Sequence, residues 1–399
     1  MKILMLCDFF GEGLQYQENL LAKYYVKHGH AVSVVTSLIE SVFEYANDTY
    51  RRPSGGPRES CVNGIRIRRL PYRTDFLKRV RTFAPLDDYL ESEAPDLIYV
   101  HDIMLNLPDA VRYVRRHPNA KLILDYHADY SNSGRNWASL RVLHGIIRKR
   151  ALDRARPHLA GLFPITPPSA RFLHEVYRVP YEEMELLPLG TDLDLCREVE
   201  LSDARTRLRA QHGVGEDGFV IITGGKLAPR KRTEMLIEAF HNLGDANVWL
   251  VVVGAAEGDA KYDDLLRRTA RGSPRVIFTG WLDTRSVCDY FAMADVAVFP
   301  GSQSILWQQA IGMGKPLVIA EPMARSGGDQ DVSYLNRCGN ILVSEDPDTR
   351  VEWLAKTISR LMHDRDLCSR MSMGARSVAS EMLDWNVTIA KTLQCCRTP

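Results

Sequence analysis

The stretch Phe299–Ile319 reads FPGSQSILWQQAIGMGKPLVI and follows a strand-like apolar run. Pro300 and Gly301 end that run, a small polar loop follows at Ser302–Ser304, and apolar sequence returns before a turn at Pro316. The order predicts a strand, a loop, a helix and a second strand. A polar loop at a helix start can present backbone N–H groups and the positive end of the helix dipole to a phosphate. We therefore expect an anion-binding turn in an α/β sheet.

Length and composition limit the class of protein. A chain of 399 residues suits two domains of roughly 150 to 200 residues each. Its formal net charge of +1 argues against a dedicated nucleic-acid binder, which usually has a strong basic excess. The eight cysteines lack CxxC or CxxH spacing, so we expect neither a disulfide framework nor a zinc site. The absence of a signal-peptide core and of any apolar run near ~20 residues predicts a soluble, cytoplasmic protein.

The N-terminal half alternates strands and helices. A strand at Lys2–Phe9, a helix at Leu14–His28 and a strand at Ala31–Thr36 form a βαβ unit, which favours a parallel, doubly wound sheet. Gly11 and Gly13 lie in the first turn, where they could bring the backbone close to a ligand or only make the turn tight. Further strands are predicted at 65–70, 97–100, 122–126 and 162–165.

Two of these strands end in histidine. His101 and Asp102 follow one strand, and His127 and Asp129 follow the next. In an open parallel sheet, ligands bind outside the carboxyl ends of the strands. A lone histidine is more often a structural hydrogen-bonding group than a catalyst, but two at successive strand ends favour a function.

Basic residues gather in two segments, Arg66–Arg81 and Arg141–Arg156, and the second has helical amphipathicity. These segments could form solvated faces. They could also form a surface that meets anionic lipid headgroups, because basic amphipathic helices bind membrane interfaces.

The C-terminal half begins after a polar segment that follows Pro188 and Gly190, which predicts a domain boundary. Its strands, at 219–223, 248–253, 276–279 and 296–299, alternate with helices. This alternation indicates a second Rossmann-like domain. Two such domains in sequence imply a cleft between them.

Five segments of the C-terminal half occur in an order that resembles one enzyme family. They read GGKLAPRKRTEMLIEAF, VVVGAAEG, VIFTGWL, YFAMADVAVFPGSQS and QQAIGMGKPLVI, from Gly224 to Ile319. The order is similar to the C-terminal domain of the retaining glycosyltransferases of family 4, which have the GT-B fold. The GxG turn, His28-Gly-His30 and the segment ending at Gly190 resemble the N-terminal domain of the same family.

The resemblance implies a GT-B architecture, with two Rossmann-like, doubly wound parallel-sheet domains. We place an acceptor-binding domain at 1–195 and a nucleotide-sugar domain at 196–379, and we expect the segment 380–399 to cross back to the first domain. The resemblance also implies a metal-independent retaining transferase that needs no cofactor. Its partners would be a nucleotide sugar, with UDP as the expected nucleotide, and a saccharide or lipid-linked acceptor in bacterial surface polysaccharide synthesis. Contact with the inner face of an anionic membrane would fit that setting.

The family pattern assigns roles by position. Lys226 and Lys231 match two cations that stabilise the leaving diphosphate, whose negative charge grows in the transition state. His127 matches a histidine that contacts the transferred sugar or stabilises charge at the reacting carbon. Trp281 stands at the position that contacts the base, although its indole could also belong to the core.

Other positions complete the expected site. On the acceptor side we place His101, Asp102 and Asp129. Contacts with the nucleotide sugar are also expected from Gly13, Gly225, Gly254, Ser302, Gln303, Ser304 and Gln309. Asp192 and Asp194 imitate the DxD motif of metal-dependent glycosyltransferases, but their place at the domain boundary favours a structural role, and we expect no metal.

The chain departs from the family at its two characteristic glutamates. The second falls on Gln309, a neutral side chain that should hold ribose hydroxyls less strongly than a carboxylate would. The first falls on Gly301, unless Gln303 or Gln308 replaces it with a shifted geometry. An active transferase is therefore our first hypothesis, and a nucleotide-sugar-binding protein with weak or no transferase activity is the second. A sugar-nucleotide epimerase of the same fold is the third.

Overall fold

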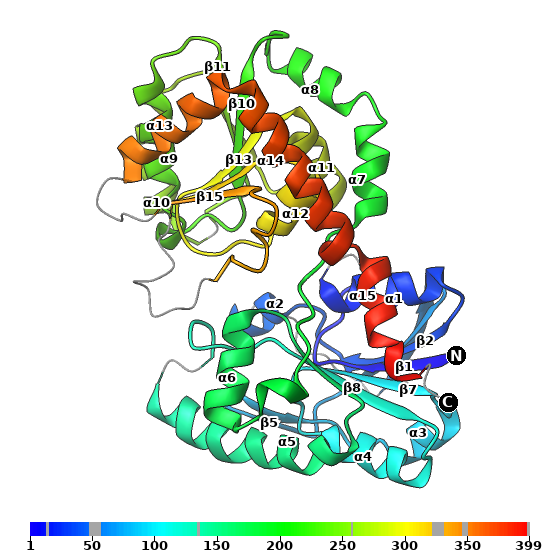
Figure 1. Cartoon of the computed structure of the whole chain (residues 1–399). Helices are drawn as coiled ribbons and strands as arrows, with labels where there is room; N and C mark the ends of the chain where they lie inside the picture. Colours follow the sequence, from blue (N-terminus) through cyan, green and yellow to red (C-terminus); the bar gives the residue numbers. More distant parts are fainter. Residues whose placement is uncertain are drawn as a thin grey trace. The chain divides into compact units, whose positions relative to one another are not determined.

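The computed structural model has two compact α/β units (Figure 1). The N-terminal unit comprises Met1–Pro188 and Trp385–Pro399, and the C-terminal unit comprises Leu189–Asp384. The structure describes residues 1–12, 16–47, 57–133, 136–256, 258–320, 331–344 and 350–396.

The N-terminal unit contains a mainly parallel sheet. Within the described ranges its seven strands lie in the order β3-β4-β2-β1-β7-β8-β9, and β3 pairs antiparallel with β4. The strands are β1 (Lys2–Leu6), β2 (Ala31–Ser37), β3 (Arg58–Val62), β4 (Ile65–Leu70), β7 (Leu97–His101), β8 (Lys121–Tyr126) and β9 (Gly161–Pro164). A separate hairpin is formed by β5 (Thr74–Phe76) and β6 (Val80–Thr82).

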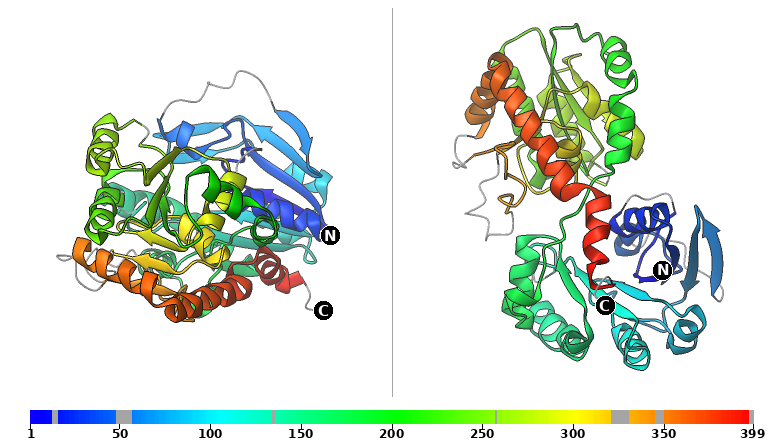
Figure 2. Two further views of the ribbon diagram at one scale, coloured as in Figure 1. Left: turned by 90° about the horizontal axis from the view of Figure 1, so that it is seen from above. Right: turned by 45° about the vertical axis from the view of Figure 1, so that its right-hand side comes forward.

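Helices cover both faces of this sheet, which explains why its central strands are almost continuously apolar. One face packs against α1 and α15, through side chains such as Tyr25 and Trp385, and Figure 2 shows these two helices side by side. The other face packs against α4, α5 and α6. The helices are α1 (Gln17–Lys27), α2 (Val42–Asn47), α3 (Asp87–Glu93), α4 (Leu107–Arg116), the π-helix η1 (Ser139–Arg148), α5 (Lys149–Ala155), η2 (Arg156–His158), α6 (Pro167–Tyr177), η3 (Tyr181–Glu183), α15 (Trp385–Thr392) and η6 (Gln394–Cys396).

The C-terminal unit contains a parallel sheet of six strands among the residues described, in the order β12-β11-β10-β13-β14-β15. The strands are β10 (Phe219–Gly224), β11 (Val248–Val253), β12 (Val276–Gly280), β13 (Val296–Phe299), β14 (Leu317–Ile319) and β15 (Ile341–Val343). Its helices are α7 (Leu193–Glu200), α8 (Ala204–Gln211), η4 (Pro229–Lys231), α9 (Thr233–Leu243), α10 (Ala260–Ala270), α11 (Thr284–Met293), α12 (Leu306–Gly312), α13 (Arg350–His363), α14 (Arg365–Val378) and η5 (Ala379–Leu383). The two Rossmann-like domains predicted from the sequence are confirmed.

The limits of the units differ by a few residues from those predicted at 195 and 379. The first limit lies after Pro188, because α7 belongs with the C-terminal unit: Asp192 caps it by accepting from the Leu195 N–H, and Cys196 is buried in that unit's core. The second limit lies at Trp385, whose indole is buried in the core of the N-terminal unit. No helix in the part of the chain that the structure describes is long and apolar enough to cross a membrane.

Candidate active site

The carboxyl ends of β10, β11 and β12 carry glycines that bring three turns together. The Gly225 N–H donates to the Val253 carbonyl at 3.0 Å, and the Gly254 N–H donates to the Gly280 carbonyl at 2.9 Å. Gly225 and Gly254 have φ values of +116° and +103°, which glycine adopts without strain. A Cβ on Gly254 would lie 2.0 Å from the Gly225 carbonyl oxygen. Two predicted site residues are therefore adjacent, and both need to be glycine.

Lys231 joins residues 226–232, which we call the basic turn, to the loop Ser302–Ser304. It ends the short helix η4 and is buried, and its Nζ donates to the Ser302 carbonyl at 3.0 Å and to the Gln303 carbonyl. Burial, and next the charge of Arg230, lowers the pKa of Lys231 to about 8. Lys231 is thus a partly desolvated cation beside the loop that we expect to bind an anion.

Gly301 is the position where the resemblance places the first glutamate, and the basic turn closes it off. A Cβ at Gly301 would lie 2.4 Å from the Arg230 carbonyl oxygen and 2.6 Å from the Lys231 carbonyl carbon. The Ser302 N–H also donates to the Arg230 carbonyl at 2.9 Å. With this backbone no side chain fits at 301, so the acidic residue is excluded by the close approach of the two loops.

We predict that Gly301→Ala lowers the free energy of unfolding by about 2 kcal/mol, because the added methyl group meets backbone atoms that cannot move alone. Gly215→Ala is the matched control, since a Cβ there has open space around it. Thermal and denaturant melts of both variants would measure the effect. If Gly301→Ala unfolds like the control, the two loops are not in the contact described.

The loop Ser302–Ser304 differs in detail from the expected helix start. Ser304 is buried, and its hydroxyl lies against Gly225, where a Cβ would be 3.1 Å from the oxygen. The following helix α12 has seven residues, so its dipole is small. The Ser302 hydroxyl is buried and makes no hydrogen bond within the described structure. The loop thus offers uncharged polar groups. The positive charge beside it comes mostly from the neighbouring basic turn.

The two glutamines of α12 point into the C-terminal unit. Gln309 Oε1 accepts from Thr191 Oγ1 at 3.0 Å, and its Nε2 donates to the sulfurs of Cys196 and Cys288 at 3.3 and 3.2 Å. Gln308 is buried and its Oε1 has no hydrogen-bond partner among the described residues, so the replacement of the first glutamate by Gln308 or Gln303 stays a prediction. The structure gives Gln309 interior partners, and its contact with ribose stays a prediction.

Two other predicted contacts lie at the surface of this unit. The Trp281 side chain is 51% exposed, which rules out the alternative that it belongs to the core. Lys226 is also exposed, one residue after Gly225. Gly13, the predicted contact from the first turn of the N-terminal unit, lies outside the described residues.

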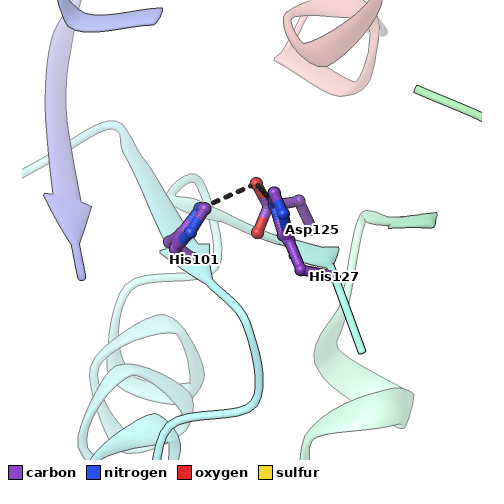
Figure 3. A group of neighbouring side chains, drawn as sticks. All are labelled: His101, Asp125 and His127. Atoms are coloured by element: carbon purple, nitrogen blue, oxygen red, sulfur yellow. Dashed lines mark hydrogen bonds and ion pairs between the residues drawn. The ribbon is translucent and has the colours of Figure 1, made fainter. Parts of the chain in front are cut away.

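In the N-terminal unit, one buried carboxylate joins the two strand-end histidines (Figure 3). Asp125 Oδ2 lies 3.0 Å from His101 Nδ1 and 3.2 Å from His127 Nε2. The same oxygen accepts from Tyr99 Oη at 2.8 Å and from Gln17 Nε2 at 3.0 Å. Asp125 therefore fixes both imidazole rings.

The charges in this group reinforce each other. Burial alone would lower the pKa of His101, but the carboxylates of Asp125 and then Glu18 raise it to about 10. Burial alone would raise the pKa of Asp125, but the two histidines hold it below its usual value. The ligand atoms of His101, Asp125 and His127 lie within 4.8 Å of one another, a spacing that could hold a metal ion.

The other two acceptor-side predictions have local roles in the structure. Asp102 has φ +63°, and its N–H donates to Asp125 Oδ1 at 2.9 Å. Asp129 Oδ1 accepts from the backbone N–H groups of Ser131 and Asn132 and from the Ser131 hydroxyl, so it orders its own turn. Contact with an acceptor stays a prediction for both.

Asp125 was not identified from the sequence, although one signal was present. It precedes His127 by two residues, and residues two apart on a strand point to the same side. Gln17 and Tyr99 could not be found this way, because they reach Asp125 from separate elements.

Comparisons with known proteins identify the family. Residues 13–190 match the glycosyl transferase 4-like domain, and residues 218–364 match glycosyl transferases group 1. Over 241 residues the chain is 28% identical to D-inositol 3-phosphate glycosyltransferase of Xylanimonas cellulosilytica. The matched region covers 58% of this chain and 55% of that protein. Over 239 residues it is 24% identical to lipopolysaccharide 1,2-N-acetylglucosaminetransferase of Salmonella typhimurium, with 57% and 54% covered. The chain thus spans about half the length of the curated relatives it matches.

Solved structures show the same fold. Anabaena HepE in complex with UDP and glucose superposes with a TM-score of 0.66 at 20% identity, covering 98% of this chain and 99% of that one. A glycosyltransferase of Rickettsia africae gives 0.70 at 13% identity, covering 99% and 97%. The matched domain models and the two Rossmann-like units agree, and the chain belongs to glycosyl transferases group 1, a family with the GT-B fold.

Proposed function

We propose that this chain is a metal-independent, retaining glycosyltransferase. It moves a hexose or N-acetylhexosamine from a nucleoside-diphosphate sugar to a saccharide or lipid-linked acceptor in surface polysaccharide assembly. The named transferase activities of the relatives and the UDP held by HepE support this class of donor and acceptor. The observation that carries the proposal is the buried cation of Lys231 beside the loop Ser302–Ser304.

The chemistry asks for fixed positive charge at the leaving group. When the bond from the sugar carbon to the diphosphate breaks, its electron pair goes to the diphosphate oxygen. The acceptor oxygen then bonds to that carbon, and its proton passes to an oxygen of the departing diphosphate. Lys231, together with Lys226, would meet the growing charge on the diphosphate without a metal. His127, held by Asp125, would contact the transferred sugar.

A second candidate function has its own observation. Gln309 is held by interior partners, and Gly301 leaves no room for an acidic side chain. Both glutamates of the family pattern are therefore replaced by neutral positions. A protein that binds the nucleotide sugar but transfers it slowly or not at all would fit these two sites.

Thermal-shift measurements with UDP, GDP, ADP and their sugars test the donor. At about a hundred times the dissociation constant, a ligand stabilises the folded state by about 2.7 kcal/mol, so we expect UDP or a UDP-sugar to raise the melting temperature by about 5 °C or more. Donor hydrolysis and transfer, assayed with and without EDTA, should give the same rate in both conditions. Binding without turnover would select the second candidate, and no shift with any nucleotide would refute both.

A further inference from the structure

The carboxylate of Asp125 and the two imidazole rings beside it have the composition of a transition-metal site (Figure 3). Asp125 Oδ2 lies 3.0 Å from His101 Nδ1 and 3.2 Å from His127 Nε2. In a tetrahedral site with metal–ligand bonds of about 2.0 to 2.1 Å, neighbouring ligand atoms are about 3.4 Å apart. The two measured separations are slightly shorter than this, so small side-chain movements would open the group to a metal ion.

Further contacts hold the three side chains in place. Glu18 is buried, and its Oε2 lies 3.9 Å from His101 Nε2, the ring nitrogen that faces away from Asp125. Metal-binding histidines usually direct their second nitrogen to a carboxylate, which orients the ring and makes the first nitrogen a better ligand. Asp125 Oδ1 accepts from the Asp102 N–H at 2.9 Å, and Oδ2 accepts from Tyr99 Oη at 2.8 Å. All three side chains therefore have neighbours of the kind that metal ligands have.

The group is open to solvent on the side of the histidines. The side chains of His101 and His127 are 21% and 25% exposed, whereas that of Asp125 is 0% exposed. An ion can therefore reach the imidazole nitrogens, where it would take the place of the protons that now link both rings to Asp125. With three protein ligands, the ion would keep at least one position for water.

We propose that His101, Asp125 and His127 bind a divalent transition-metal cation of the class of Zn²⁺. Imidazole nitrogens favour Zn²⁺, Ni²⁺ and Cu²⁺, whereas Mg²⁺ and Ca²⁺ favour oxygen ligands. The ion is not a cofactor of the proposed transfer reaction, which needs no metal. A bound ion instead occupies the His127 nitrogen and holds the ring, so we expect Zn²⁺ to inhibit sugar transfer. That inhibition rests on the proposed function, but the binding of the ion does not.

Equilibrium dialysis of the full chain against Zn²⁺, followed by zinc determination, tests the site. Wild type should hold about one equivalent more than His101→Gln or His127→Gln, and excess Mg²⁺ should not displace it. His117→Gln is the matched control. His117 Nε2 also lies 2.8 Å from a carboxylate, that of Glu91, but His117 belongs to no group of three metal-binding side chains in the described part of the chain. This control should bind as much Zn²⁺ as wild type.

The thiols of Cys395 and Cys396 are an alternative pair of zinc ligands, because their sulfurs lie 3.8 Å apart. The titration is therefore repeated with both replaced by serine. In that background His127→Gln should still remove about one equivalent of Zn²⁺. Melting temperatures measured without metal show that each variant is folded.

Sugar transfer with added Zn²⁺ tests the expected inhibition. Saturating Zn²⁺ should stop most of the transfer by wild type, and excess EDTA should restore it. His101→Gln should need at least about tenfold more Zn²⁺ for half-inhibition, since even the loss of an outer partner of a metal ligand costs about ten- to a hundredfold. Full inhibition of wild type and His101→Gln at the same Zn²⁺ concentration would show that the ion acts elsewhere.

Two results would overturn the metal site. One is an equal zinc content in wild type and in the folded histidine variants. The other is that the serine background binds no Zn²⁺, which would assign the ion to the thiols. Zinc binding is measured without substrate, so a protein that binds the additional equivalent but transfers no sugar would refute the proposed function and leave the metal site standing.

Discussion

Lys231→Ala is expected to lower kcat for sugar transfer by about a hundredfold or more, the usual effect of removing one group that stabilises transition-state charge. Two unit charges ~4 Å apart interact by roughly 4 kcal/mol at an effective dielectric of 20, which makes a loss of this size physically reasonable. The Lys231 ammonium is buried and aimed at the Ser302 and Gln303 carbonyls, so a water molecule cannot easily replace it. Steady-state kinetics with a UDP-sugar, and UDP binding measured separately, would give the effect.

Arg230→Ala is the matched control, because it removes an exposed cation from the adjacent position. Its kcat should stay within about threefold of wild type. The pKa of Lys231, lowered to about 8, gives a second test: kcat/KM should fall as pH rises above about 8, when the free enzyme loses this charge. Lys231→Arg should move that loss to higher pH. A near-normal kcat in Lys231→Ala would remove Lys231 from the reaction.

Asp125→Asn is expected to lower the free energy of unfolding by about 3 kcal/mol near neutral pH, because it leaves the His101 imidazolium without its buried partner. In the wild type, Tyr99 Oη and Gln17 Nε2 both donate to one carboxylate oxygen of Asp125. An asparagine NH₂ at that place cannot accept these hydrogen bonds. Since Asp125 also fixes His127, transfer should slow more than nucleotide binding weakens.

The loss of unfolding free energy in Asp125→Asn depends on pH through the two shifted pKa values. His101 has its pKa raised from 6.5 to about 10, so its contribution to stability is fully present below pH 6.5 and is lost as pH rises to about 10. The pKa of Asp125 is lowered, so its contribution to stability is present above pH 3.8 and is lost at more acidic pH. The difference between wild type and Asp125→Asn should therefore be largest between these limits and should shrink towards pH 10.

Asp129→Asn is the control for this experiment. Asp129 follows the same strand, and its Oδ1 accepts from the Ser131 and Asn132 N–H groups, which an amide oxygen can also do. The melting temperature of Asp129→Asn should stay close to that of wild type, and the difference between the two should not change as pH rises towards 10. Equal pH profiles for the two variants would show that the His101 charge does not depend on Asp125.

The sequence predicted the strands that are buried on both faces, because they appear as short apolar runs between turns. Ile65–Leu70 and Val248–Val253 agree in full with β4 and β11. The exposed edge strand β3 was not predicted, since RESCV has no apolar pattern to mark it, and the short strands β5 and β6 lie apart from the main sheet. Pattern arguments detect burial, so they miss strands that are held by backbone hydrogen bonds at an edge.

At the site, sequence reasoning reached the residues on the turns but not the partners that hold them. Gly225 and Gly254 stand where the turns required glycine. The environment of Gln309 was out of reach, because Thr191 and Cys196 are more than a hundred residues away in the chain. The hydrogen-bond partners of Asp125 were also out of reach, because Gln17 and Tyr99 lie on α1 and β7, 108 and 26 residues away in the chain.

The close approach at Gly301 has a practical consequence for redesign of this protein. The carbonyls of Arg230 and Lys231 occupy the space where a side chain at 301 would begin. An exchange of residue 301 alone cannot place an acidic side chain beside the loop Ser302–Ser304. The loop would have to be lengthened, and the turn at Arg230 and Lys231 rebuilt with it, so the two segments can only be redesigned together.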